Sequence, residues 1–141
     1  MARADFYLIT TPRFRTEPLR LVCELARKAF DAGLPTLVLA RSQEQAEALD
    51  DLLWDMGDEV YIPHQIAGAE EDEDEAEVLI AAPDVDAALR PLVINLRDAA
   101  VEGAFDRVLE VVPADESARG PLRERWKQYQ ARGLELKKHD M

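Results

Sequence analysis

Short apolar runs alternate along this chain with longer segments whose apolar residues recur at helical spacing, and this alternation constrains the fold more than any other feature. The apolar runs have strand length and lack a polar face, as strands do when helices cover both sides of a sheet. The expected strands are 5–10, 35–40, 78–81, 92–96 and 107–112, with a small edge strand at 134–137. Strands and helices in this order predict an α/β fold of Rossmann-like type, with a mainly parallel sheet and helices on both faces.

Three helices are expected between these strands, and local signals mark their ends. The first follows Thr16, a possible N-cap, and stops near Gly33. The second follows Ser42, which forms a capping box with the glutamine three residues later, and ends at Gly57. The last spans 117–131. The segment 60–63 is expected to be a short extended piece.

Length and composition predict one domain, 1–141, that buries its own core. Segment 70–77 is almost entirely acidic and is expected to be a solvated surface loop. A single cysteine, Cys23, cannot form an internal disulfide, which favours a reducing compartment. No apolar run approaches the roughly 18 residues that a membrane span needs. We therefore expect a cytoplasmic protein that makes no contact with membranes.

The net charge of −12 is unevenly divided along the chain. Residues 1–118 carry a balance of −16, whereas residues 119–141 carry seven basic against three acidic side chains, a balance of +4. An acidic body repels nucleic acid, because phosphate binding needs a field of the opposite sign. The basic segment therefore favours a local site for an acidic partner. The alternative, a solvated helix face, is equally compatible with charge alone.

The sequence contains no recognisable motif for binding nucleotides or metals or for nucleophilic catalysis. The turn at 10–15, where such a sheet would hold phosphate, has no glycine, and the chain has neither GxxxxGK nor GxGxxG. Cys23 lies in a helix and is expected to be a small core residue, and His64 is expected to be structural. His139, near the C-terminus, is expected to be disordered. We therefore expect no cofactor, no metal and no catalytic residue.

The last helix carries the most suggestive arrangement. A cationic ridge at spacing four runs beside an apolar stripe that should face the sheet. The ridge is Arg119, Arg123 and Lys127, and the stripe is Leu122, Trp126 and Tyr129. An arginine next to an aromatic wall would suit a peptide that carries carboxylates and a bulky apolar residue. Spacing alone slightly favours the alternative, a solvated charged helix with Trp126 in the core.

Two further aromatic residues, Trp54 and Tyr61, flank Gly57 near the end of the second helix. Aromatic residues near turns are enriched at protein interfaces, because they bury much area at little entropic cost. The sequence alone favours a position in the core for both.

Several short motifs, in order along the whole chain, resemble the chi subunit family of bacterial DNA polymerase III. They are FYLI at 6–9, Leu49-Asp50, Leu53-Trp54, Tyr61-Ile62-Pro63-His64, Ala67-Gly68, Val111-Val112-Pro113, Arg123-Glu124-Arg125-Trp126-Lys127, Tyr129 and Gly133. The resemblance implies a Rossmann-like domain without nucleotide binding. It also implies a replication adaptor with two partners: the acidic, aromatic-ended tail of single-stranded DNA-binding protein, and either psi, the subunit that tethers chi to the clamp loader, or a repair helicase. Contact with DNA would then be only indirect.

The resemblance implies that six residues of this chain form the two partner-binding sites. The tail site comprises Arg119, Arg123, Trp126 and Val112, and the psi or helicase site comprises Trp54 and Tyr61. Gly120-Pro121 falls where the family tends to continue a helix, which predicts a later helix start and a displaced Arg119. The rival hypothesis is an α/β enzyme or nucleotide-regulated domain with an unrecognised site.

Overall fold

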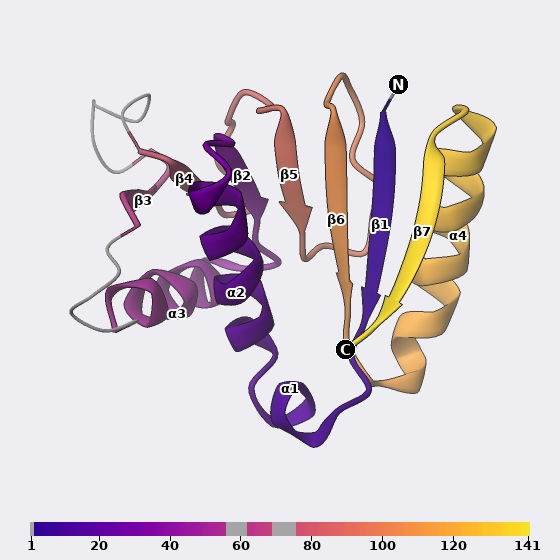
Figure 1. Ribbon diagram of the computed structural model, residues 1–141, viewed down its shortest axis with the longest axis horizontal. Helices are drawn as coiled ribbons and strands as arrows, with labels where there is room; N and C mark the ends of the chain where they lie inside the picture. Colours follow the sequence, from indigo (N-terminus) through magenta and orange to yellow (C-terminus); the bar gives the residue numbers. More distant parts are fainter. Residues whose placement is uncertain (1, 56–61, 69–75) are drawn as a thin grey trace.

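The computed structural model describes residues 2–55, 62–68 and 76–141. Within them, seven strands form one sheet in the order β3-β4-β2-β5-β6-β1-β7, and all neighbouring strands are parallel (Figure 1). The strands are β1 (Arg3–Leu8), β2 (Thr36–Leu39), β3 (His64–Ile66), β4 (Val78–Ala81), β5 (Leu92–Asn95), β6 (Arg107–Val112) and β7 (Glu135–Asp140). The predicted fold class, an α/β domain with a parallel sheet, is confirmed.

Helices cover both faces of this sheet, also as predicted. They are α1 (Pro12–Thr16), α2 (Pro18–Asp31), α3 (Gln43–Trp54) and α4 (Arg119–Ala131), with a 3₁₀ turn at Glu116–Ala118 directly before α4. The helices α2 and α3 share one apolar core with the sheet, whereas α4 packs with Phe6 and Val108 on the opposite face. Figure 1 shows α4 at the β7 end of the sheet and α2 and α3 at the β2–β4–β3 end.

The helix starts follow proline and serine chemistry. Ser42 caps α3 as predicted, because its Oγ accepts a hydrogen bond from the Gln45 amide at 3.0 Å. The prediction for Thr16 is wrong: Thr16 ends α1, and Glu17 precedes α2 without a side-chain cap. Pro12 and Pro18 each stand in the first turn of a helix, where a missing amide hydrogen costs nothing.

The C-terminal segment is ordered further than the sequence predicts. The strand β7 continues to Asp140 and pairs with β1 from Arg3–Glu135 to Leu8–Asp140. His139 is not disordered: its ring stacks on Tyr7 with centroids 4.6 Å apart. Without β7, β1 would be an edge strand. The backbone hydrogen bonds that β1 offers to β7 outweigh the polar character of the β7 residues.

Four other expectations fall near the borders of the described residues. α4 begins at Arg119 with Gly120-Pro121 in its first turn, so the predicted later start is wrong. The unpredicted strand β3 follows the expected extended piece, of which residues 60–61 lie outside the described part. Gly57 and residues 70–75 also lie outside it. Ala76, within the expected solvated loop, is buried, and Arg90 donates a hydrogen bond to its carbonyl at 2.8 Å.

Candidate functional site

The helix α4 separates its basic side chains onto two faces. Arg119, Arg123 and Lys127, four residues apart, are exposed, whereas Arg125 is only 3% exposed. Arg132, just after the helix, donates to the carbonyls of Val101 and Gly103. The helix therefore uses some of its cations to hold the fold and leaves others on the surface.

Arg125 is held in a buried polar cluster centred on Glu110, which is fully buried in β6. Arg125 Nε lies 2.9 Å from Glu110 Oε1. The Tyr129 hydroxyl donates to Glu110 Oε2 at 2.6 Å, and Asn95 Nδ2 donates to the same oxygen at 2.8 Å. Burial raises the pKa of Glu110, against the opposing charge of Arg125 and the bonds from Asn95 and Tyr129. This cluster fastens α4 to β5 and β6, and so fixes the direction of the exposed ridge.

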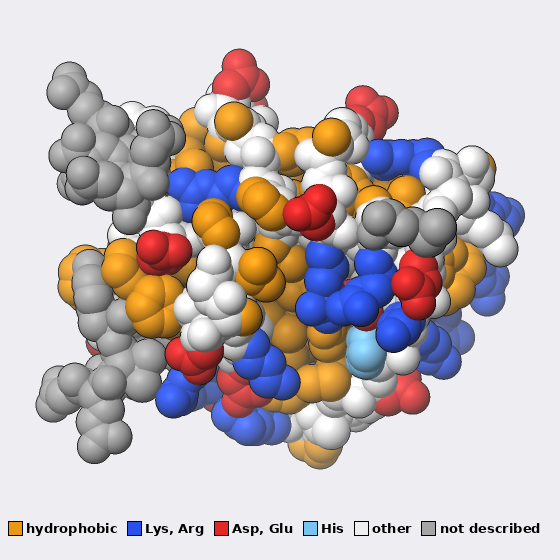
Figure 2. Space-filling view, turned by 45° about the horizontal axis from the view of Figure 1, so that its top comes forward, with side chains coloured by type: hydrophobic (Ala, Val, Ile, Leu, Met, Phe, Trp, Pro, Cys, Tyr) orange, Lys and Arg blue, Asp and Glu red, His pale blue; other side chains and the backbone are white. Residues whose placement is uncertain are grey.

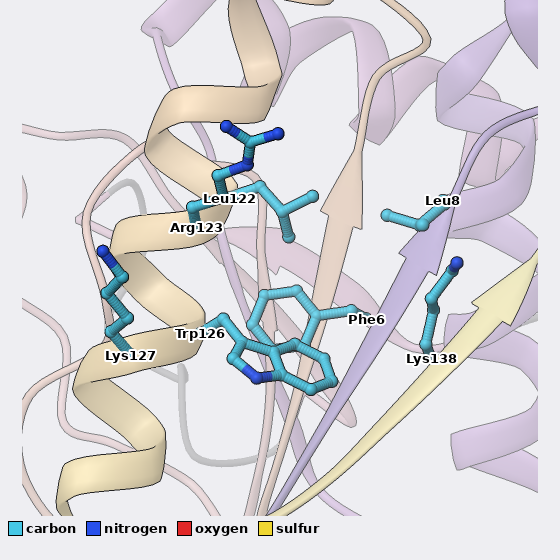
Figure 3. Close-up of a pocket in the computed structure, with 7 residues that line it drawn as sticks. All are labelled: Phe6, Leu8, Leu122, Arg123, Trp126, Lys127 and Lys138. Atoms are coloured by element: carbon cyan, nitrogen blue, oxygen red, sulfur yellow. The ribbon is translucent and has the colours of Figure 1, made fainter.

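An apolar pocket of about 310 Å³ lies between α4 and the strands β1 and β7. Its walls are formed by the apolar and aromatic side chains of Phe6, Leu8, Leu122 and Trp126. Three basic side chains stand at its rim: Arg123, Lys127 and Lys138. Phe6 and Trp126 pack against each other with ring centroids 5.1 Å apart. Figure 3 shows Arg123 and Lys127 projecting from α4 on one side and Lys138 from β7 on the other, with the two aromatic rings between them.

A second hollow of about 180 Å³ adjoins this pocket and shares Leu8 and Leu122 with it. It is lined by the other two residues predicted for the tail site, Arg119 and the buried Val112. The structure therefore distributes the four predicted residues over two neighbouring hollows. Sequence reasoning missed the contribution of β1 and β7, although the alternation of Leu136 and Lys138 along β7 already places both on one face.

Trp54 does not lie in the core, contrary to the interpretation that sequence alone favoured. It is 58% exposed and meets the buried His64 edge to face, with ring centroids 5.1 Å apart. His64 has the structural role that was expected: Nδ1 lies 2.6 Å from the Ile62 carbonyl, and Nε2 lies 3.3 Å from Asp50. Tyr61 lies outside the described residues. An exposed tryptophan that packs against a buried, hydrogen-bonded ring is typical of protein interfaces.

A second charged cluster lies on the opposite face of the sheet from α4. Asp5, only 1% exposed, receives Arg107 Nε at 2.6 Å and Arg3 Nε at 3.0 Å, and His139 Nε2 lies 3.0 Å from it. Figure 2 shows Lys and Arg side chains gathered beside a histidine on this side of the molecule. Burial raises the pKa of Asp5, but the bonds to His139 and Arg107 and the charges of Arg107 and Arg3 outweigh it, and the pKa is lowered.

Cys23 is the single cysteine of the chain and lies in neither charged cluster. Cys23 is buried, as predicted, and burial raises the pKa of its thiol to about 11, so that it stays protonated at neutral pH. Within residues 2–55, 62–68 and 76–141, no group of histidine, cysteine and acidic side chains has the arrangement of a metal site. No helix in the same ranges is long and apolar enough to cross a membrane.

Together, the fold and the pocket define a class: a parallel α/β domain with an apolar, cation-rimmed pocket beside its last helix. Residues 1–137 match the model of the family described as "DNA polymerase III chi subunit, HolC". Proteins named DNA polymerase III subunit chi are similar over nearly their whole length. The one from Escherichia coli K12 is 34% identical (96% of each chain), and the one from Pseudomonas aeruginosa is 32% identical (99% of this chain and 96% of that one).

The chain therefore belongs to the DNA polymerase III chi subunit family, a family of DNA replication subunits, and the resemblance drawn from its motifs is confirmed. A DEAD box protein from Methanococcus jannaschii shares the fold alone. It superimposes with a TM-score of 0.57 at 15% identity over 98% of this chain, which spans 41% of that structure.

Proposed function

We propose that this protein is a non-catalytic adaptor of the replication machinery. Its pocket binds the acidic, aromatic-ended C-terminal tail of single-stranded DNA-binding protein, and a second surface links it to the clamp loader through psi or to a repair helicase. Membership of the chi subunit family supports this role. The cytoplasm is the compartment in which both partners would be met.

The observation that carries the proposal is the composition of the pocket between α4 and β1. Phe6 and Trp126 offer an apolar space of a size suited to an aromatic side chain, and Arg123 stands at its edge. A guanidinium can hold a terminal carboxylate through two parallel hydrogen bonds, which a lysine cannot do. A C-terminal aromatic residue carries the ring and the carboxylate on the same residue, and so matches both features.

Arg119 and Val112 extend the proposed site along the adjoining hollow. Val112 supplies apolar wall, and Arg119 continues the cationic ridge by one helical turn. A peptide longer than its final residue would then contact both hollows over the shared side chains Leu8 and Leu122.

The surface around Trp54 is the proposed contact for psi or a helicase. Its exposed indole offers a large apolar anchor at the end of α3, away from the α4 pocket. Tyr61 is proposed to belong to the same contact because of the family resemblance.

Isothermal calorimetry with the tail peptide tests the proposal. We expect Arg123→Ala to weaken binding about ten- to a hundredfold, since a hydrogen bond to a charged group contributes roughly 1.5–3 kcal/mol. Arg123→Lys should recover part of the loss, and Arg123→Glu should be worse than alanine. A peptide without its last aromatic residue should not bind.

Equal binding of the full and truncated peptides would exclude the pocket, and equal affinities across the Arg123 series would exclude the carboxylate clamp. The rival hypothesis, an enzyme or nucleotide-regulated domain, is tested with the same protein by thermal shift. Stabilisation by a nucleotide or a divalent metal, but not by the peptide, would favour the rival.

A further inference from the structure

The strand β7 supplies a wall of the pocket that the family motifs do not include. Lys138 lines the pocket from β7, opposite the cations of α4 (Figure 3). Among the described residues, none of Arg123, Lys127 and Lys138 forms a salt bridge. No carboxylate from the described part of the chain lines the pocket. An apolar cavity thus has uncompensated positive charge on two opposite sides.

The register of β7 determines that Lys138 faces this cavity. Lys138 pairs with Phe6 of β1, and paired residues of neighbouring parallel strands point to the same face. Lys137 pairs with Asp5 and points to the other face. The register is fixed beyond the strand, because the Met141 amide donates to the Leu8 carbonyl at 2.8 Å and the Met141 carbonyl accepts from Thr11 at 2.9 Å.

We infer that Lys138 is a specificity-determining residue: it holds an acidic side chain that precedes the terminal residue of the bound peptide, while Arg123 holds the terminal carboxylate. This inference rests on the proposed function. The Cα of a C-terminal residue sends its carboxylate and its amide nitrogen in different directions. With the ring in the cavity and the carboxylate on the α4 side, the preceding residues leave across the opposite wall, where Lys138 stands.

The two cations then select different features of the same ligand. The planar guanidinium of Arg123 matches the geometry of a carboxylate, whereas the ammonium of Lys138 is a compact charge on a flexible stem. Lys138 therefore selects negative charge ahead of the terminal residue, and either aspartate or glutamate satisfies it. Arg123 selects the free end of the chain.

A double-mutant cycle between protein and peptide tests these roles. The proteins are wild type, Lys138→Ala, Lys137→Ala and Arg123→Ala. The peptides are the acidic tail, the same tail with a C-terminal amide, and the tail with its acidic side chains replaced by amides. The variant Lys137→Ala is a matched control, since it removes the same charge from the neighbouring residue on the other face of the sheet.

We expect Lys138→Ala to weaken binding of the acidic tail about two- to fivefold, the range for an exposed ion pair, and Lys137→Ala to leave it unchanged. The loss at Lys138 should vanish with the neutralised peptide and persist with the amidated one. The loss at Arg123 should show the reverse pattern.

The possible failures are distinguishable. If wild type does not bind the acidic tail, the proposed function itself is wrong. If wild type binds and Arg123→Ala weakens binding, but Lys138→Ala and Lys137→Ala behave alike, only the role of Lys138 is overturned. If the loss at Lys138 depends on the terminal amide instead of the acidic side chains, the assignment of the two cations is wrong.

Discussion

Arg123 and Arg125 lie two residues apart on α4 and should respond in opposite ways to the same substitution. Arg125→Met removes the cation that faces the fully buried Glu110 at 2.9 Å. Removing one partner of a buried pair costs about 3–5 kcal/mol, because the other charge stays buried without compensation. Asn95 and Tyr129 still donate to Glu110 in the variant, so we expect the lower end of that range. In a chain of this size, such a loss lowers the melting temperature by roughly 10 °C or more.

Arg123→Met should change the free energy of unfolding by less than about 0.5 kcal/mol, since Arg123 is exposed and forms no salt bridge with any of the described residues. Urea unfolding followed by far-ultraviolet circular dichroism measures both variants, and calorimetry with the tail peptide measures the binding that Arg123→Met should lose. Adding Glu110→Gln to Arg125→Met should recover part of the stability, because it removes the uncompensated charge. Equal stability of the two single variants would refute this account of α4. If Glu110→Gln recovers no stability in the Arg125→Met background, Arg125 contributes to stability through packing and not through its charge.

Three further predictions concern other parts of the molecule. The pKa of Asp5 is lowered, so the stabilisation that its carboxylate contributes is complete above the ordinary pKa of 3.8 and is lost as the pH falls through the lowered pKa. Asp5→Asn should therefore make the free energy of unfolding, measured by urea unfolding, depend less on pH in the acidic range. Trp54→Ala should weaken capture of psi or a helicase in a pull-down, with tail binding and stability nearly unchanged, since the indole is 58% exposed; a large loss of stability would refute this surface role. Affinity for the tail peptide should fall as the salt concentration rises from about 0.05 to 0.5 M. An unchanged dissociation constant would show that electrostatic attraction does not contribute to binding.

The strands that sequence reasoning placed correctly are those whose apolar residues are buried on both faces. Both 78–81 and 107–112 match β4 and β6 residue for residue. The strand β7 was underestimated because its second half, Lys138 to Asp140, is polar. An edge strand with one open face needs little apolar character, and its extent is decided by the backbone bonds that β1 offers.

The buried cluster on α4 escaped prediction for a different reason. The sequence prediction counted Arg125 only among the basic side chains of residues 119–141, because a short-range pattern does not show what lies opposite a helix in space. A signal was present in Glu110, a charged residue inside a strand that is otherwise apolar. A buried carboxylate requires a partner, and a cation on the helix that covers the same face is the natural candidate. The face occupied by Arg125 followed from its spacing to Tyr129.

The distribution of charge is compatible with the proposed binding of an acidic peptide by a chain of net charge −12, and we expect it to disfavour nucleic acid. At physiological ionic strength, fields between exposed charges fade over about 8 Å, so a ligand in the pocket responds mainly to the cations at its rim. Arg125 and Glu110 are buried as a pair and add little to this field. A short acidic tail fits within the cation-rimmed surface. A nucleic acid strand, with phosphates along its whole length, would have to continue from that surface onto the acidic body, where each further phosphate meets repulsion.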